Sequence, residues 1–391
     1  MHILDADCGR TPVNLAFCLT KYFPTGGLQR DFLRMAACCL DRGHAVDVYT
    51  GEWHGDKPEG LKVVRLKAAG WTNHRRTESL AAALSVKVAE GPYDAVVGFN
   101  KMPGLDYYFA ADPCFAAKAA AKGFLYRMSG RCRTYLRMEA AVFAPTSGTR
   151  ILSISDPQQR LYMRHYGTPA ERFYHLPPGI SPDRLKGADS EAMGESLRHE
   201  LALDPAQRLV LMVGNNYRLK GVDRAIRSLA SLPRDLLTQT VLVVVGHGRA
   251  APYRRLARRL GISDRVCFMG TRNDVPRFLM GADLLLHPAY EENTGTVLIE
   301  ALAAELPVLV TEVCGYSHHI RAADAGEVVP EPFRQADLDR LLARMLAGDR
   351  TARWRRNARA YVAATDIFSL TETAVKTIET VGPWSSCRIP G

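Results

Sequence analysis

Long apolar runs are absent from this chain of 391 residues. No stretch approaches the roughly 18 to 20 consecutive apolar residues that a membrane-spanning helix needs. The sequence also does not open with the basic segment and short apolar run that are typical of a secretion signal. The composition, 47% hydrophobic, instead suits a globular protein with substantial cores, which we expect to be cytoplasmic.

C-x-x-C pairs are absent as well, and acidic residues are fewer than basic ones. The nine cysteines are scattered and none belongs to a C-x-x-C pair, so they indicate reduced thiols that mostly fill the core. Lysine and arginine number 51 against 41 aspartates and glutamates, which gives a formal net charge of +10. This excess indicates an anionic partner: a nucleic acid, a phosphorylated substrate or an acidic membrane surface.

The signatures of two common protein classes are missing. No G-x-G-x-x-G motif follows the first predicted strand, which argues against a dinucleotide-dependent oxidoreductase. No recognition helix, zinc motif or OB-fold signature accompanies the positive charge, so a nucleic-acid-binding protein stays only as the non-enzyme alternative.

The chain does contain a regular alternation of apolar, strand-like runs with helical patterns. Such alternation predicts α/β domains in which helices cover both faces of parallel sheets. The length suits two Rossmann-like domains of roughly 180 residues each, with a proline-rich break at residues 176–182. Residues 1–11 are polar and precede the first strand, and we interpret them as a dispensable extension. The predicted strands are residues 13–17, 45–49, 95–99, 150–154, 209–213, 241–245, 284–286 and 308–310.

Two glutamates eight residues apart, Glu292 and Glu300, form the most informative pattern. Their spacing alone is weak evidence, but Glu292 follows an apolar strand and Glu300 lies in the next predicted helix. That helix opens with the small residues Thr294, Gly295 and Thr296. Open amides at a helix start attract anions, and a carboxylate there can hold sugar or ribose hydroxyls. The crevice therefore suits a nucleotide-sugar donor.

Two other strand-to-helix junctions have features of phosphate sites. Gly26 and Gly27 follow the first strand and would let backbone amides approach a ligand, although a tight turn without a ligand is the alternative. In the second half, Gly214 ends a strand and Lys220 precedes the following helix. A lysine in that position can neutralise a pyrophosphate, and Arg218 is a second candidate cation.

Two further loops end strands on the same side of the predicted second sheet, at residues 246–248 and 271–273. Backbone groups near Thr271, Arg272 and Asn273 could read the edge of a pyrimidine base. This interpretation depends on assigning the donor to the second half.

Patterns that could bind a metal are weak. D-x-D strings occur at residues 5–7 and 337–339, but the first precedes the fold and the second falls in a predicted surface helix. We interpret the adjacent histidines at 318–319 as loop residues rather than ligands. We therefore predict no metal and no other cofactor.

Positive charge concentrates between residues 118 and 137. This stretch has no acid and six cations: Lys118, Lys122, Arg127, Arg131, Arg133 and Arg137. At about 100° per residue, six apolar or aromatic residues share about a third of a helix circumference: Phe124, Leu125, Met128, Cys132, Tyr135 and Leu136. The pattern predicts a basic amphipathic helix in an anionic membrane interface. An ordinary surface helix packed on the sheet is the alternative.

Five segments together resemble one known family. Residues 23–31, 98–106, 176–180, 220–224 and the block around the two glutamates resemble the lipopolysaccharide core glucosyltransferase I (WaaG) family, within the retaining GT-B glycosyltransferases of family 4. The match runs from about residue 13 to about residue 370. It implies a GT-B fold of two Rossmann-like domains facing a cleft. The implied parts are an acceptor domain at 1–178, a donor domain at 179–365 and a C-terminal helix at 366–391 that returns to the first domain.

The resemblance also implies the reaction and its location. Glucose would pass from UDP-glucose to an inner-core heptose of lipopolysaccharide, with retention, in an alpha-1,3 linkage and without a metal. The enzyme would work peripherally on the anionic inner face of the inner membrane. A related transferase with another donor, such as ADP-heptose, UDP-N-acetylglucosamine or GDP-mannose, is the alternative. Because no good nucleophile for a double displacement is evident, we favour same-face attack with a phosphate oxygen as the base.

Carried over position by position, the resemblance assigns roles to single residues. Glu300 would hold the ribose hydroxyls, Lys220 the diphosphate and Glu292 the transferred sugar. The segment Asn293, Thr294, Gly295 and Thr296 would add backbone amides. In the first half, Gly26, Gly27 and Asp31 would lie at the donor sugar and phosphate, and Asp106 near the reacting centre. The chain departs from the wider group at Asn215, because many members have an arginine at this position. Whether Arg218 supplies the second cation instead is left open.

Overall fold

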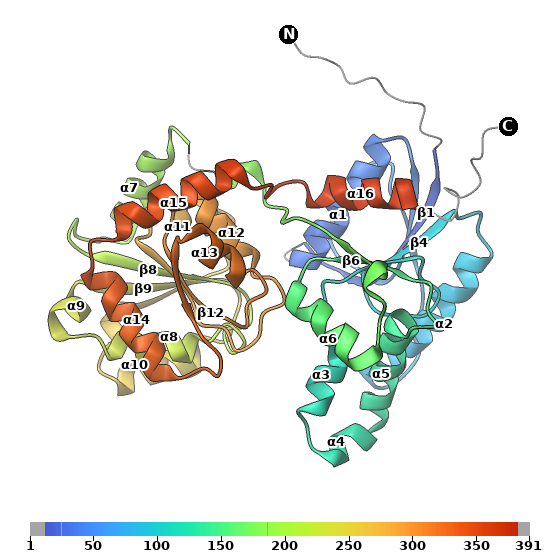
Figure 1. The fold of residues 1–391 in the computed structure, drawn as a ribbon, viewed down its shortest axis with the longest axis horizontal. Helices are drawn as coiled ribbons and strands as arrows, with labels where there is room; N and C mark the ends of the chain where they lie inside the picture. Colours follow the sequence, from blue (N-terminus) through green and yellow to red (C-terminus); the bar gives the residue numbers. More distant parts are fainter. Residues whose placement is uncertain (1–11, 25, 186, 382–391) are drawn as a thin grey trace, which may run out of the picture. The chain divides into compact units, whose positions relative to one another are not determined.

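A computed structural model describes residues 12–24, 26–185 and 187–381. The chain divides into two compact units, Met1–Pro177 with Ser369–Gly391 (unit 1) and Pro178–Phe368 (unit 2). Figure 1 shows in each unit a sheet that lies between helices. The predicted fold class, two Rossmann-like α/β domains with parallel sheets, is confirmed. Within the described ranges, no helix is long and apolar enough to cross a membrane.

Unit 1 contains a seven-stranded parallel sheet in the order β3-β2-β1-β4-β5-β6-β7. Its strands are β1 (Asn14–Tyr22), β2 (Ala45–Trp53), β3 (Lys62–Arg65), β4 (Ala95–Gly98), β5 (Tyr107–Phe109), β6 (Arg150–Ser153) and β7 (Phe173–His175). Its helices are α1 (Gly27–Asp41), α2 (Asn73–Ala89), α3 (Phe115–Ala120), α4 (Phe124–Met128), α5 (Gly130–Phe143), α6 (Asp156–Tyr166), η1 (Ala170–Arg172) and α16 (Leu370–Val381). Fully buried aromatic side chains such as Phe17, Phe32 and Phe99 pack between the sheet and its helices.

Unit 2 contains a six-stranded parallel sheet in the order β10-β9-β8-β11-β12-β13. Its strands are β8 (Arg208–Val213), β9 (Thr240–Val245), β10 (Val266–Gly270), β11 (Leu284–His287), β12 (Val308–Thr311) and β13 (Gly326–Val329). Its helices are η2 (Pro182–Arg184), α7 (Ser190–Glu200), α8 (Val222–Ala230), α9 (Arg234–Thr238), α10 (Ala251–Arg259), η3 (Ser263–Arg265), α11 (Val275–Gly281), α12 (Thr296–Ala303), α13 (Ser317–Ala323), α14 (Gln335–Ala347) and α15 (Thr351–Ala364). Strand residues of β9 are buried throughout, as expected for a parallel sheet covered on both faces.

The basic stretch from Lys118 to Arg137 is not one amphipathic helix, so that prediction is wrong. It folds as α3, α4 and α5, with breaks around Gly123 and at Ser129. Ser129 has an extended backbone, ends α4, and accepts a hydrogen bond on its hydroxyl from the amide of Cys132 at 3.2 Å. A side-chain cap of this kind starts a new helix in a new direction, which a count of 100° per residue cannot detect.

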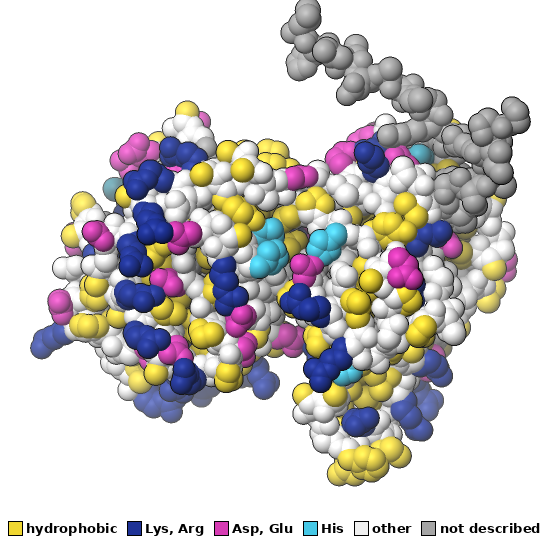
Figure 2. Space-filling model, viewed as in Figure 1, with side chains coloured by type: hydrophobic (Ala, Val, Ile, Leu, Met, Phe, Trp, Pro, Cys, Tyr) yellow, Lys and Arg dark blue, Asp and Glu magenta, His cyan; other side chains and the backbone are white. Residues whose placement is uncertain are grey.

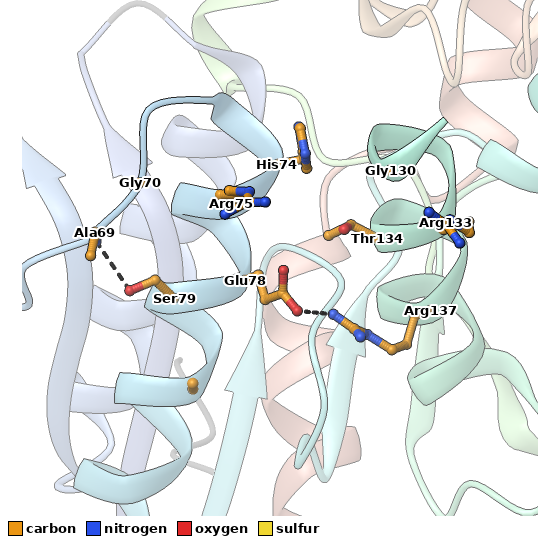
Figure 3. A pocket seen from close by; sticks show the side chains of 11 residues that line it. Ala69, Gly70, His74, Arg75, Glu78, Ser79, Gly130, Arg133, Thr134 and Arg137 are labelled. Carbon is orange, nitrogen blue, oxygen red and sulfur yellow. Dashed lines mark hydrogen bonds and ion pairs between the residues drawn. The ribbon is translucent and has the colours of Figure 1, made fainter. Parts of the chain in front are cut away.

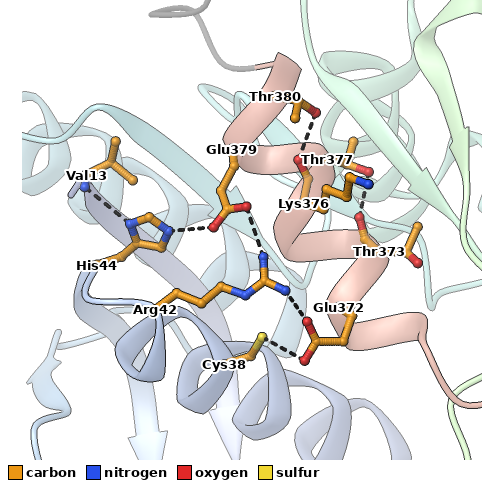
Figure 4. A network of polar contacts seen from close by, with 10 residues as sticks. All are labelled: Val13, Cys38, Arg42, His44, Glu372, Thr373, Lys376, Thr377, Glu379 and Thr380. Atoms are coloured by element: carbon orange, nitrogen blue, oxygen red, sulfur yellow. Dashed lines mark hydrogen bonds and ion pairs between the residues drawn. The ribbon is translucent and has the colours of Figure 1, made fainter. Parts of the chain in front are cut away.

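The C-terminal helix α16 packs on α1 through a buried ionic network (Figure 4). Arg42 lies 2.9 Å from the carboxylate of Glu379, whose other oxygen is 2.9 Å from His44 Nε2. Since the amide of Val13 donates to His44 Nδ1, the imidazole proton resides on Nε2 and is donated to Glu379. Glu379 and His44 are 8% and 2% exposed at their side chains, so the network is shielded from solvent.

Replacing Glu379 by alanine is expected to lower the free energy of unfolding of unit 1 by about 2 to 3 kcal/mol, because it leaves the buried His44 without its carboxylate and Arg42 with only the exposed Glu372. Urea unfolding followed by fluorescence would measure the loss. Glu372→Ala is the matched control on the same helix, since Glu372 also pairs with Arg42 but is 62% exposed. We expect that control to cost no more than about 1 kcal/mol. Equal losses for the two variants would contradict the burial argument.

Candidate active site

The candidate site of unit 2 lies at the carboxyl ends of β8 and β11. The chain runs from β8 outward to β9 and β10, then returns to β11 beside β8 and continues to β12 and β13 on the other side. This reversal makes a topological switch point, the place where parallel α/β sheets bind ligands. Lys220 follows β8 and Glu292 follows β11, so the two predicted residues come from the two strands at the switch point.

Lys220 and Glu292 form an ion pair at this point. Their side chains are 21% and 14% exposed, and burial lowers the pKa of Lys220. His287, the last residue of β11, is fully buried with Nε2 3.2 Å from the same Glu292 oxygen. Burial, with the charge of Lys220 as a smaller cause, lowers the pKa of His287 well below its usual value, so the imidazole is neutral. A neutral ring that donates from Nε2 fixes the Glu292 carboxylate while leaving its negative charge in place.

Glycines allow the close approach of these loops. Gly221 has a φ of +72°, and a Cβ there would stand 2.1 Å from the carbonyl oxygen of Pro288. A Cβ on Gly214, at a φ of +153°, would meet the Lys220 Cε at 2.9 Å. Any larger residue at these two positions would displace the loop after β11 or the stem of Lys220.

Arg224 secures the loop that carries Glu292, and the residue-level prediction missed it. Its guanidinium carbon lies 3.6 Å from the ring centroid of Tyr290 and 3.5 Å from that of Phe333. It also donates to the carbonyl of Ala289 at 2.9 Å. Arg224 lies in the segment 220–224 that was matched by resemblance, but its pattern alone gives no hint of a stacked arginine. We assign it a positioning role.

The start of α12 presents backbone amides beside Glu292. Gly295 caps the helix with a φ of +86°, and the amide of Tyr316 donates to the carbonyl of Thr294 at 2.7 Å. The amide of Leu298 donates to the carbonyl of Gly295 at 2.8 Å, so the first-turn amides that this helix start can offer to an anion are those of Thr296 and Val297. Glu300 is buried in the second turn of α12, with one carboxylate oxygen 3.7 Å from Arg184 Nε. Sequence reasoning missed Arg184, which precedes the sheet by more than twenty residues.

The other residues of unit 2 that were considered for donor binding lie on the loops after β8 and β10. Arg218 is exposed on the loop between β8 and α8. Arg272 donates to Asp274 at 2.7 Å and lies 3.5 Å from Glu200, so its guanidinium is engaged by acids. Its neighbours Thr271 and Asn273 are exposed after β10. Asn215, at the position of the departure from the wider group, accepts the amide of His247 at 2.7 Å and joins two loops.

The predicted residues of unit 1 fall into two places. Gly26 caps α1, Gly27 begins it, and Asp31 lies in its second turn at the carboxyl edge of the sheet. Burial raises the pKa of Asp31 to about 6, although Arg30 and Arg34 oppose the shift. Asp106 is at the opposite edge, before β5, where its carboxylate accepts the amide of Val96 at 2.8 Å. The structure therefore does not bring Asp106 to the ligand-binding edge, which corrects the prediction that it lies near the reacting centre.

The patterns considered for metal binding have structural roles. Asp337 pairs with Arg334 and Arg340 on α14, each at 2.9 Å. The histidines at 318–319 belong to α13 rather than to a loop, and His319 Nδ1 lies 2.6 Å from the hydroxyl of Tyr361. The D-x-D string at residues 5–7 lies outside the described residues. In the part of the chain that the structure describes, no three His, Cys, Asp or Glu residues are grouped as metal ligands would be.

Two units with parallel sheets, and a lysine paired with a glutamate at the switch point of the second sheet, indicate a glycosyltransferase with the GT-B fold. The family model for glycosyl transferases group 1 matches residues 194–361. The lipopolysaccharide glucosyltransferase WaaG of Escherichia coli strain K12 is 46% identical over 367 residues, which cover 93% of this chain and 98% of that protein. The chain therefore belongs to the WaaG family, as the resemblance predicted.

Solved structures agree with this assignment. A crystal structure of WaaG, described as a glycosyltransferase involved in lipopolysaccharide biosynthesis, has 45% identity and a TM-score of 0.88 and covers 94% of this chain and 100% of that one. Anabaena HepE in complex with UDP-glucose covers 94% of this chain and 100% of its own with a TM-score of 0.72. At 18% identity, that similarity concerns the fold alone.

Proposed function

We propose that the chain transfers glucose from UDP-glucose to an inner-core heptose of lipopolysaccharide, with retention and in an alpha-1,3 linkage. The observation that carries this proposal is the 46% identity, over 93% of the chain, to an enzyme named lipopolysaccharide glucosyltransferase. The chemistry of the site in unit 2 is compatible with it. Asp106 is left out of the proposed site because its carboxylate is used within unit 1.

Three parts of the site at the switch point would each bind a different part of the donor. Lys220 and the first-turn amides of α12 would bind the diphosphate, since both offer positive charge where β8 and β11 end. Glu292 would accept hydrogen bonds from the glucose hydroxyls. Glu300, buried in the second turn of α12, would hold the ribose, with Arg184 orienting its carboxylate.

Breaking the sugar–phosphate bond places positive charge on the anomeric carbon and negative charge on UDP. Lys220 and the amides stabilise the departing diphosphate, and Glu292 lies beside the lysine with its charge retained. We propose that the acceptor hydroxyl attacks on the face that UDP leaves and gives its proton to a phosphate oxygen. In this scheme the cation and amides do what a metal ion does in other transferases, so no metal is required.

A panel of labelled UDP-glucose, UDP-N-acetylglucosamine, ADP-heptose and GDP-mannose, each offered with heptose-terminated lipopolysaccharide, tests the proposal. We expect transfer from UDP-glucose alone and an unchanged rate in EDTA. Transfer from another donor, or loss of activity in EDTA that manganese restores, would overturn the corresponding part of the proposal. Binding of UDP, GDP and ADP to the protein without acceptor separates the nucleotide preference from the sugar preference.

Membrane association is the second part of the proposal, and α4 supplies its main support. Phe124, Leu125 and Met128 are 73%, 86% and 57% exposed, and we call these three residues the apolar tip. Figure 2 shows hydrophobic side chains gathered at the foot of unit 1, where Figure 1 places α4. Exposed cations surround the tip in the sequence: Lys118, Lys122, Arg127, Arg131 and Arg133. An exposed apolar cluster with basic neighbours fits the anionic inner face of the inner membrane.

Three residues of the helix predicted to face the membrane are engaged within unit 1. Tyr135 is half-buried, with its ring centroid 5.4 Å from that of Phe115. Arg137 forms an ion pair with Glu78 on α2. Cys132 is fully buried inside unit 1. The proposed membrane surface is therefore centred on α4 and not on a single long helix.

The triple variant Phe124→Ser, Leu125→Ser, Met128→Ser is expected to weaken binding to vesicles that contain phosphatidylglycerol by at least tenfold. Each side chain contributes roughly 1 to 2 kcal/mol of transfer free energy when it enters the interface. Flotation with vesicles measures the change, and wild-type binding should weaken with salt. The control Val86→Ser removes another exposed apolar side chain, on α2, and should leave binding unchanged. Equal binding of the triple variant and the wild type would contradict the assignment of the tip.

A further inference from the structure

A cavity of about 720 Å³ lies within unit 1, between the N-terminal halves of α2 and α5 (Figure 3). The loop after β3 closes one side through Ala69 and Gly70. Both helices begin at the carboxyl edge of the sheet. Helix α2 follows the carboxyl end of β3. Helix α5 ends near the start of β6, at the amino edge, so its own N-terminus lies towards the carboxyl edge. The cavity thus lies on the edge where parallel α/β sheets bind ligands, but it is separate in the sequence from the junction at Gly26 that was predicted to bind phosphate.

The lining of this cavity is positively charged. Three arginines and one glutamate line it, together with His74: Arg75, Arg133, Arg137 and Glu78. In Figure 3, Arg137 points from α5 towards α2 and forms an ion pair with Glu78. Arg75 and Arg133 are exposed, and neither has an acidic partner among the ion pairs of the described residues. The cavity therefore keeps two uncompensated positive charges.

These cations lie at helix starts, where a positive charge is unfavourable. The first turns of α2 and α5 contain no acidic residue, although acids are the residues that stabilise the positive end of a helix. His74 and Arg75 occupy the first turn of α2, and Arg133 lies in the first turn of α5. Two helix dipoles and two arginines thus direct positive potential into one cavity, and a bound anion would relieve the repulsion.

An exposed tryptophan adjoins the cavity. Trp71 is 100% exposed and directly follows Gly70, which lines the cavity wall. A tryptophan is rarely left fully in solvent, and its flat apolar face suits the C–H face of a sugar ring. A volume of 720 Å³ is also far larger than one phosphate or carboxylate group needs. The combination of cavity, cations and aromatic favours an anionic sugar over a simple ion.

We propose that this cavity binds the anionic sugars of the lipid-linked acceptor, by their phosphate or carboxylate groups, while Trp71 packs on a sugar ring. The apolar tip supports the placement, because Met128 of the tip is only two residues from Gly130 in the cavity wall. A glycolipid whose tails lie in the membrane at α4 would bring its first, anionic sugars to the start of α5. This inference rests on the proposed function, since it concerns the acceptor of that reaction.

The test uses a deacylated, phosphorylated inner-core oligosaccharide that ends in heptose and has no lipid tails. Binding to the full chain is followed by calorimetry and by tryptophan fluorescence, and transfer is followed with UDP-glucose. For Arg75→Gln with Arg133→Gln, we expect at least a tenfold weaker Kd and higher KM for the oligosaccharide, a smaller salt dependence, and an unchanged Kd for UDP. Trp71→Ala should lose several-fold in affinity and most of the fluorescence change.

Arg255→Gln with Arg258→Gln is the control, because it removes the same charge from two exposed helical arginines of α10. It should leave oligosaccharide binding unchanged. If the double cavity variant binds the oligosaccharide as the wild type does, the inference is wrong, whatever the activity. If it keeps its affinity for the oligosaccharide and loses only binding to phosphatidylglycerol vesicles, its arginines serve the membrane surface proposed above, and the inference is again wrong. If the wild type neither binds the oligosaccharide nor transfers sugar to it, the proposed function itself is wrong.

Discussion

Replacing Lys220 by alanine is expected to reduce the turnover of glucose transfer by about 10² to 10³-fold, the typical effect of removing one preorganised group that stabilises developing negative charge. Lys220 precedes α8 at the switch point, with its ammonium group already held beside Glu292 and its stem lying on Gly214. Burial lowers the pKa of this ammonium group, so its charge is less hydrated than that of a surface lysine and interacts more strongly with a diphosphate.

The measurement combines turnover with UDP affinity. We expect Lys220→Ala to lower both kcat and the affinity for UDP, because the lysine would bind the diphosphate before and during bond breaking. Lys57→Ala, which removes an exposed lysine from a loop of unit 1, is the control for a loss of one charge. Circular dichroism should confirm that both variants fold. Near-normal turnover of Lys220→Ala would remove the central cation from the mechanism and leave only the helix amides.

How much of this structure the sequence predicts depends on whether a feature is set by neighbouring residues or by residues far apart in the sequence. The strand predicted at 45–49 is observed as β2, in which Val46, Val48 and Tyr49 are buried, because a short apolar pattern of this kind is a local signal. The strands β3, β5, β7 and β13 were missed: β5 has three residues, and β3, β7 and β13 lack the fully buried run that β11 and β12 have. Periodicity has too few residues to register in such elements. The loop predicted at 271–273 implied β10 without giving its bounds.

The candidate site shows the same division. Lys220, Glu292 and Gly295 each follow a strand or open a helix, so local pattern and resemblance located them. Arg184 contacts Glu300 only when segments distant in sequence come together. His287 is five residues from Glu292, but no sequence pattern shows that its ring faces that carboxylate. Asp106 illustrates the converse error, since its matched segment says nothing about which edge of the sheet its carboxylate faces.

Replacing Glu292 by glutamine is expected to separate donor binding from transfer. The carboxylate of Glu292 is paired with the ammonium group of Lys220, so a diphosphate that binds Lys220 must compete with this carboxylate and also lies close to its negative charge. Glutamine keeps the shape but removes that competition, and we expect UDP to bind several-fold more tightly. Transfer should nevertheless fall by about 10- to 100-fold, which corresponds to losing a hydrogen bond between a charged group and the sugar.

This contrast distinguishes a sugar-binding role from a merely structural one. Glu291→Gln, which makes the same change one residue earlier, is the control and should alter neither quantity. If Glu292→Gln weakened UDP binding as strongly as Lys220→Ala does, Glu292 would serve only to hold the lysine in place. Tighter UDP binding with slower transfer would mean that the carboxylate acts on the sugar, and that the donor must open the ion pair between Lys220 and Glu292 when it binds.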